Sequence, residues 1–302
     1  MSETEVETKP EPAGSHSHVP GSFQQILKLT RAQFQEYLSS RRFVILLGIV
    51  AMIGLIITVV IGAFHDRAFL QALVSSPLAF YGSFWGGAAS FVIVLSAVFF
   101  GGDAIAGEFQ NKTGYFLMGL PIRRATVYIG KYIAALMASF SVMVLFLVIA
   151  LLNGAYYFGG NAFPWQIGPS FLLAVMYLFA VLGTTFLFSS LFKTSAYGFV
   201  LTAILFLFGF TILQDLVQAL VKMEPWMVIS YASSAIGDVF APTVNWGLTG
   251  TITHTVVPVG RGGTITNTSY TAGVEEGIAI MLAYFLLTGL VGLLWFEREE
   301  FA

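Results

Sequence analysis

The chain has 302 residues, of which 57% are hydrophobic and only 10% are charged, and its mean hydropathy is +0.81. Soluble domains carry about 25% charged residues, so this composition indicates a protein embedded in a lipid bilayer. The chain has no cysteine, which excludes disulfides, thiol catalysis and cysteine-based metal sites. The formal net charge of −2 says little about partners, and the positions of the charges are more informative.

The N-terminal residues 1–21 are rich in Glu, Pro and Ser and too polar to bury a core. We therefore expect a disordered tail at 1–21, followed by a transmembrane domain at 22–302. Within 22–40, apolar side chains such as Phe23, Leu27 and Phe34 recur at helical spacing, with Lys28 and Arg31 between them. Because an apolar run follows at once, this pattern favours an amphipathic interfacial helix over an ordinary soluble one.

Six long apolar runs follow this amphipathic segment. They cover about 43–64, 82–101, 132–157, 170–191, 196–214 and 277–296. Each approaches or exceeds the roughly 20 residues that a helix needs to cross a hydrocarbon core. The runs are too continuous for barrel strands, so the sequence predicts an all-α integral membrane protein with six transmembrane helices.

The basic residues predict the orientation of these helices. If the N-terminus is cytoplasmic, only Arg67, Lys222 and Arg261 of the fourteen lysine and arginine residues fall outside. Positive residues gather on the cytoplasmic side of membrane proteins. We therefore expect both termini in the cytoplasm.

A long segment, about 215–276, separates the fifth and sixth apolar runs and is predicted to be extracytoplasmic. Its first part, 225–241, is apolar but short and broken by Pro225 and Gly237, so we expect it to be interfacial or re-entrant rather than spanning. Its second part is rich in Thr and Val on either side of Gly260 to Gly263, which predicts a small hairpin.

The sequence lacks the motifs of several kinds of chemistry. It has no GxxxxGK[ST] phosphate loop, no HExxH metal motif and no GxSxG nucleophile elbow. We expect no catalytic residue, no metal site and no enzymatic activity in this chain. Ion-coupled carriers place ionisable groups in mid-membrane, whereas Asp103 and Asp215 lie near the ends of their runs. An ion-coupled carrier is therefore a weak alternative.

The loop between the second and third runs is the most informative stretch. We expect Gly101–Lys112 to continue the second helix, and Thr113-Gly114 to end it. Pro121 then starts a new piece that leads into the third run. The positive-inside rule explains the arginines of this loop, but it does not explain Glu108 or Pro121. Loop charges of this kind, Glu108 included, are expected to be removable at little cost in stability.

These residues resemble the signature loop of ABC exporter permeases of the second type, an ABC-2-like family, and the spelling is similar to archaeal members. The shared pattern is an acidic residue after span two, Thr-Gly, Leu, Pro-x-x-Arg and a Gly-Lys that opens span three. In this chain the pattern corresponds to Glu108, Thr113-Gly114, Leu117, Pro121-Ile122-Arg123-Arg124 and Gly130-Lys131. The resemblance extends over residues 22–302, although only the loop is specific.

The resemblance implies a permease subunit of the cell membrane that pairs with a second permease chain, identical or different, and with two ABC ATPase subunits. It implies no cofactor on this chain, ATP and Mg on the partner ATPase, surrounding membrane lipid, and no nucleic acid. The coupling residues would be Glu108, Thr113, Gly114, Pro121, Arg123, Arg124 and Lys131. The main alternative is a polytopic membrane anchor or assembly factor that transports nothing.

The second run also carries a row of small residues. Gly82, Gly86 and Ser90 follow small-xxx-small spacing, which lets helix backbones approach closely. We expect this face to pack against another helix, although glycine is simply common in this chain.

Overall fold

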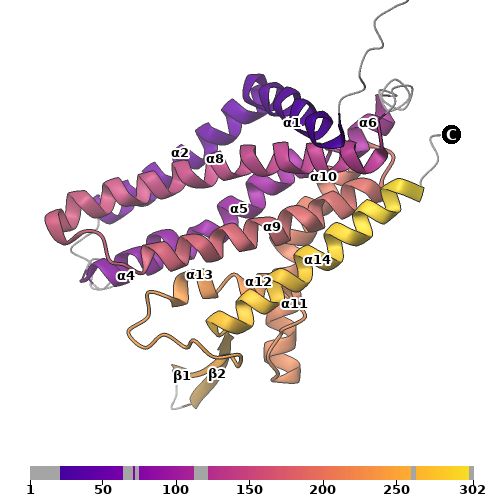
Figure 1. Ribbon diagram of the computed structural model, residues 1–302. Coiled ribbons are helices and arrows are strands. Elements are labelled where there is room, and N and C mark those ends of the chain that lie inside the picture. The colour runs from indigo at the N-terminus through magenta and orange to yellow at the C-terminus, as the bar shows by residue number, and fades with distance from the viewer. Residues whose placement is uncertain (1–20, 64–70, 72–74, 112–121, 260–262, 299–302) are drawn as a thin grey trace, which may run out of the picture.

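The computed structural model describes residues 21–63, 71, 75–111, 122–259 and 263–298. The fold is an all-α integral membrane bundle with one small β-hairpin (Figure 1). Six helical segments are long and apolar enough to cross a membrane, which confirms the predicted number. They are Arg41–Ala63, Pro77–Gln110, Arg124–Phe158, Ile167–Leu191, Ser195–Val221 and Val274–Arg298.

The first span is a single helix, α2 (Arg41–Ala63), preceded by α1 (Ser22–Ser39). The α1 helix packs on the start of α8 (Arg124–Phe158), the third span, where the Thr30 hydroxyl donates a 3.1 Å hydrogen bond to the carbonyl of Gly130. Phe23 and Leu27 of α1 are exposed, as expected for an amphipathic helix with an apolar face outside the bundle.

The second span consists of several pieces: α4 (Pro77–Tyr81), a π-helical turn η1 (Gly82–Gly86), α5 (Gly87–Gly101) and α6 (Ala106–Gln110). It begins five residues before the predicted start because Ser76 caps it, accepting a hydrogen bond from the Ala79 amide, with Pro77 in the first turn. The predicted continuous helix through Lys112 is wrong for residues 102–105, which form a turn between α5 and α6.

Spans two and four form the centre of the bundle. The fourth span, α9 (Ile167–Leu191), lies against α5, and both are largely buried. The α14 helix (Val274–Arg298), the sixth span, packs along α9. Large aromatic side chains fill the core, among them Trp85, Tyr177 and Phe146. Spans one, five and six bury much less of their surface, so they form the outside of the single chain.

The fifth span also combines several helical types: α10 (Ser195–Ile204), η3 (Leu205–Gly209), α11 (Phe210–Leu216) and η4 (Val217–Val221), where η3 and η4 are π-helical. It ends at Lys222, whose left-handed backbone (φ 54°) cannot continue the helix. A 3-10 turn, η2 (Gly159–Asn161), directly follows α8.

The segment between spans five and six contains two short helices, α12 (Ile229–Ala232) and α13 (Ala235–Asp238), and neither is long enough to span. The predicted hairpin is confirmed: β1 (Thr251–Val259) pairs antiparallel with β2 (Gly263–Thr271), with Thr251 opposite Thr271. These elements lie at one end of the bundle, while α6 and the C-terminal end of α14 lie at the other (Figure 1). We call them the loop end and the charged end.

The loop end is fastened by close backbone packing and hydroxyl bridges. Gly86 of η1 lies so near α13 that an added Cβ would stand 2.4 Å from the Cα of Gly237. Ser170 of α9 links the same elements, because its hydroxyl accepts a 3.0 Å hydrogen bond from the Trp85 indole and donates a 2.6 Å bond to the carbonyl of Ile236. The loop segment is therefore packed onto the spans rather than suspended above them.

Candidate functional site

The candidate site lies at the charged end, where α1, α2, the α5–α6 turn and the start of α8 converge. A cavity of about 520 Å³ opens there. Polar and charged side chains from all four elements line it, including Glu36, Tyr37, Arg42, Asp103, Glu108 and Lys131. A polar cavity at the end of an otherwise apolar bundle is a candidate functional site.

Lys131 is the most deeply buried charge of this cavity. Its side chain is 6% exposed, and its ammonium group forms an ion pair with Glu108, whose side chain is 17% exposed. The same ammonium donates a 2.9 Å hydrogen bond to the carbonyl of Ala104. A buried ammonium needs such partners, because its desolvation is expensive. Lys131 therefore attaches the α5–α6 turn and α6 to the third span.

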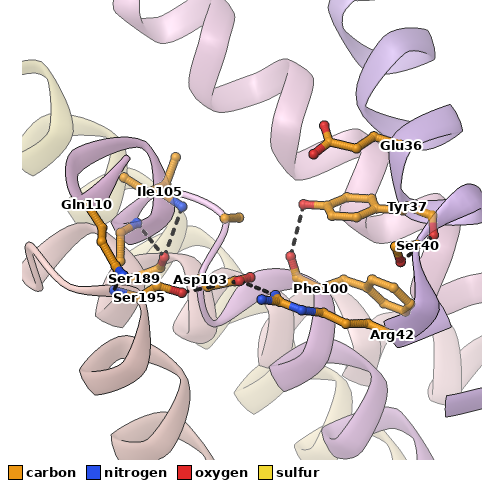
Figure 2. Close-up of polar contacts among 12 residues, drawn as sticks. Glu36, Tyr37, Ser40, Arg42, Phe100, Asp103, Ile105, Gln110, Ser189 and Ser195 are labelled. Atoms are coloured by element: carbon orange, nitrogen blue, oxygen red, sulfur yellow. Dashed lines mark hydrogen bonds and ion pairs between the residues drawn. The ribbon is translucent and has the colours of Figure 1, made fainter. Parts of the chain in front are cut away.

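A second ion pair attaches the same turn to the first span. Arg42, at the start of α2, pairs with Asp103 in the turn (Figure 2). The Ser195 hydroxyl, at the start of α10, donates a 3.3 Å hydrogen bond to the same carboxylate. The Arg42 side chain is 61% exposed and that of Asp103 only 16%, so the pair lies at the edge of the cavity.

Uncharged groups hold the backbone of the turn from its other side. The Ser189 hydroxyl oxygen on α9 accepts hydrogen bonds from the amides of Ile105 (3.0 Å) and Ala106 (3.1 Å), as Figure 2 shows. The side-chain oxygen of Gln110 accepts a 2.8 Å bond from the Ser195 amide. The Ser189 contacts satisfy donors at the start of α6, and the Gln110 contact satisfies the donor at the start of α10, which helices leave unpaired at their N-termini. The α6 helix is therefore fixed against α9 and α10.

Tyr37 joins α1 to the same place. Its phenol donates a 3.1 Å hydrogen bond to the carbonyl of Phe100, and the two rings lie 5.3 Å apart (Figure 2). Burial raises the pKa of the Tyr37 phenol, and the negative charge of Asp103 raises it further. The phenol therefore stays protonated and remains a donor at physiological pH.

The residues that were assigned to coupling on the basis of the sequence do not form one cluster in the structure. Glu108 and Lys131 meet in the cavity, whereas Arg123 and Arg124 lie beside the end of α14, where Arg124 donates a 3.1 Å hydrogen bond to the carbonyl of Glu297. Thr113, Gly114 and Pro121 lie outside the described residues. The sequence reading missed Tyr37, Ser189, Ser195 and Gln110, whose roles depend on contacts between distant elements.

The small residues of span two lie far from this cavity. Gly82 and Gly86 face α13 at the loop end, where a Cβ on Gly82 would come 3.3 Å from the Cβ of Phe240. Ser90 is half-buried on α5. Among residues 21–63, 71, 75–111, 122–259 and 263–298, no three His, Asp or Glu side chains are placed to hold a metal ion.

The six apolar helices define a multi-pass membrane protein. At one end they carry a polar joint, which consists of the α5–α6 turn, α6 and their contacts with α2, α8, α9 and α10. A family model described as ABC-2 family transporter protein matches residues 36–209, more than half of the chain, and the chain belongs to this family. It is accordingly the membrane permease subunit of an ABC transporter. No curated protein sequence matches the chain. The matched residues include the whole α5–α6 joint.

Proposed function

We propose that this permease belongs to an ATP-driven exporter and that the segment after α6 is its contact with a separate ATPase subunit. The observation that carries the proposal is the buried Lys131–Glu108 pair, which joins α6 to the third span. Charges in an exposed loop contribute little to stability, so a loop without a further role would not be expected to contribute a residue to a buried ion pair. The buried pair links α6 to α8, so it supports a role for α6 in passing a displacement to the third span.

The joint contacts four of the spans. A displacement of α6 reaches α8 through Lys131, α2 through the Asp103–Arg42 pair, and α9 and α10 through Ser189 and Ser195. In this proposal ATP and Mg are bound by the partner, and this chain supplies no catalytic group. Two permease chains, identical or different, form the export path between them, and closure of the ATPases rocks one against the other.

The proposal places the charged end in the cytoplasm, as the distribution of basic residues predicts. Because the chain has no cysteine, one introduced thiol can report the orientation. Lys193, between α9 and α10, and Thr243, between α13 and β1, are both exposed. Lys193→Cys should react with a membrane-impermeant maleimide only after permeabilisation, and Thr243→Cys should react in intact cells. The reverse pattern would contradict the orientation and the ATPase contact together.

The coupling itself is tested by isolating the permease from its native membrane. We expect an ABC ATPase subunit to copurify with it, and the purified chain alone to hydrolyse no ATP. A crosslinker placed at Asn111→Cys, the last described residue before the loop, should capture that ATPase. The same thiol at Thr243 is the matched control and should capture none. Isolation without any ATPase would favour the alternatives of a membrane anchor or an ion-coupled carrier.

A further inference from the structure

A hollow of about 410 Å³ opens at the loop end between span two and α13. Gly86 and Gly237, whose backbones touch, both line it. Gly87 also lines it and leaves it open, because an added Cβ there would meet no atom within 4 Å. The other described lining residues are small or apolar, apart from two serines and Asp238, the one charged residue among them. We call this site the acidic hollow.

The charge of Asp238 has no counter-charge in the part of the chain that the structure describes. The hydroxyls of Ser234 and Thr271 hydrogen-bond to its carboxylate, and no cation is among the groups that act on it. Ser234 also donates its single proton to the carbonyl of Tyr231 at 2.9 Å, so it cannot fully serve both acceptors. The Oδ2 atom of Asp238 is buried and accepts no hydrogen bond from the described residues. A partly buried carboxylate in this state is costly, and a bound cation would lower that cost.

The surroundings of the acidic hollow have the same sign of charge. The described residues 222–259 and 263–276 contain four carboxylates and one lysine, namely Glu224, Asp238, Glu275, Glu276 and Lys222. Two further basic residues, Arg67 and Arg261, lie outside the described residues. Clefts lined by one sign of charge raise the local concentration of ions of the opposite sign. The described part of the loop end therefore favours a cation over an anion.

We propose that the acidic hollow binds an organic ammonium ion, with its charge at Asp238 and its alkyl groups against Leu78, Phe240 and Pro242. A hard metal ion fits poorly, because it needs roughly six to eight oxygen ligands and the described walls are mainly glycine and apolar side chains. An aromatic wall such as Phe240 suits alkylated ammonium groups. A zwitterionic lipid headgroup is disfavoured, because its phosphate would meet the same negative charge. The proposal does not depend on the export function proposed above, since it rests on the loop end alone.

The test compares three soluble probes by titration calorimetry on the purified full-length chain at about pH 7.5, where the Asp238 carboxyl is ionised. Choline carries the ammonium group, 3,3-dimethyl-1-butanol has the same shape without the charge, and glycerophosphocholine adds a phosphate. Choline should bind at least about tenfold more tightly than either of the others. Asp238→Asn keeps the shape of the side chain and should weaken choline binding by a similar factor. Gly87→Leu should weaken it as well, because the new side chain enters the hollow without a clash.

Two variants serve as matched controls. Gly48→Leu adds the same side chain at an exposed glycine of span one with open space, and Asp215→Asn neutralises an exposed carboxylate of span five that does not line the hollow. Both should bind choline as the wild type does. Equal affinities of the wild type for choline and 3,3-dimethyl-1-butanol, or no measurable binding of either, would overturn the proposal. So would unchanged choline binding by Asp238→Asn, or binding of glycerophosphocholine as tight as that of choline, because the hollow would then accept a lipid headgroup.

Discussion

The two ends of the bundle are fastened in different ways. At the charged end, long side chains reach between elements and pair by charge, as Lys131 does with Glu108. At the loop end, backbones touch directly at Gly86 and Gly237, and short hydroxyls bridge the rest. Long, flexible side chains can keep an ion pair while the helices that carry them shift slightly, whereas backbones in direct contact at glycines cannot move closer without a clash. We therefore expect the charged end to tolerate a small displacement better than the loop end does.

The largest effect should come from the glycine contact. Gly86→Ala places a methyl group 2.4 Å from the Cα of Gly237, which neither backbone can avoid without moving. We expect a loss of roughly 3 kcal/mol or more in stability, measured as a lower thermal midpoint in detergent. The neighbouring Gly87 is the matched control, because a Cβ there meets nothing within 4 Å. Equal midpoints for Gly86→Ala and Gly87→Ala would show that the loop end is not held by this contact.

The next effect concerns the buried ion pair. Glu108→Gln leaves the ammonium of Lys131 buried without its counter-charge, so we expect a loss of roughly 2 to 4 kcal/mol. The sequence reading expected little cost here, and the structure changes that expectation. The double variant Glu108→Leu with Lys131→Met removes both charges and should recover most of the thermal midpoint. If the single and double variants were equally destabilised, the pair would matter through its shape and not its charge.

The next prediction concerns the loop end, whose contribution to stability should depend on pH. Asp238 ends α13, and burial raises its pKa from the ordinary 3.8 to about 6. The folded state then holds a proton that the unfolded state has released, so stability should fall as the pH rises from about 4 to about 6 and level off above that. Asp238→Asn should remove this fall and be more stable than the wild type at pH 7, on the order of 1 kcal/mol given its partial exposure.

Thermal midpoints of both proteins, taken between pH 4 and pH 8, check this expectation. The two curves should converge near pH 4 and separate as the pH rises toward 7. Curves that stay parallel across the range would mean that Asp238 ionises at the same pH in the folded and unfolded protein.

The smallest effect should come from the other ion pair of the joint. Arg42 is mostly exposed, so water and salt screen its attraction to Asp103. Arg42→Gln should cost less than about 1 kcal/mol at low salt and almost nothing at high salt. A loss as large as that of Glu108→Gln would remove the distinction drawn here between a buried and a peripheral pair.

The six spans could be predicted because a bilayer demands long apolar runs, and such runs are local properties of the sequence. Their ends were underestimated, since Pro77–Tyr81 and Arg124–Lys131 contain aromatic, polar or basic residues that the hydropathy of a run excludes. Ser76 before Pro77 is a recognisable helix start that could have corrected the first of these. The π-helical turns leave no comparable signal, because they depend on packing around them.

The candidate site was predicted only in part, for a geometric reason. Glu108 and Lys131 could be singled out as unusual loop charges, but their pairing crosses a turn whose course local patterns do not determine. Asp103 and Arg42 are 61 positions apart, and Ser189 lies 84 positions from Ile105. Sequence patterns of period 3.6 describe one helix at a time, so contacts between helices stay hidden until the bundle is known.

The length of α8 has a mechanical consequence. At 35 residues, this unbroken helix is about 52 Å long, well beyond the roughly 30 Å hydrocarbon thickness. One extremity holds Lys131, and the other packs Phe158 against Phe80 near the start of span two. If such a rod pivots about its middle by about 5°, each tip travels roughly 2 Å in opposite directions. A small tilt imposed at one membrane surface is thereby felt at the other, with no change in any helix's internal hydrogen bonds.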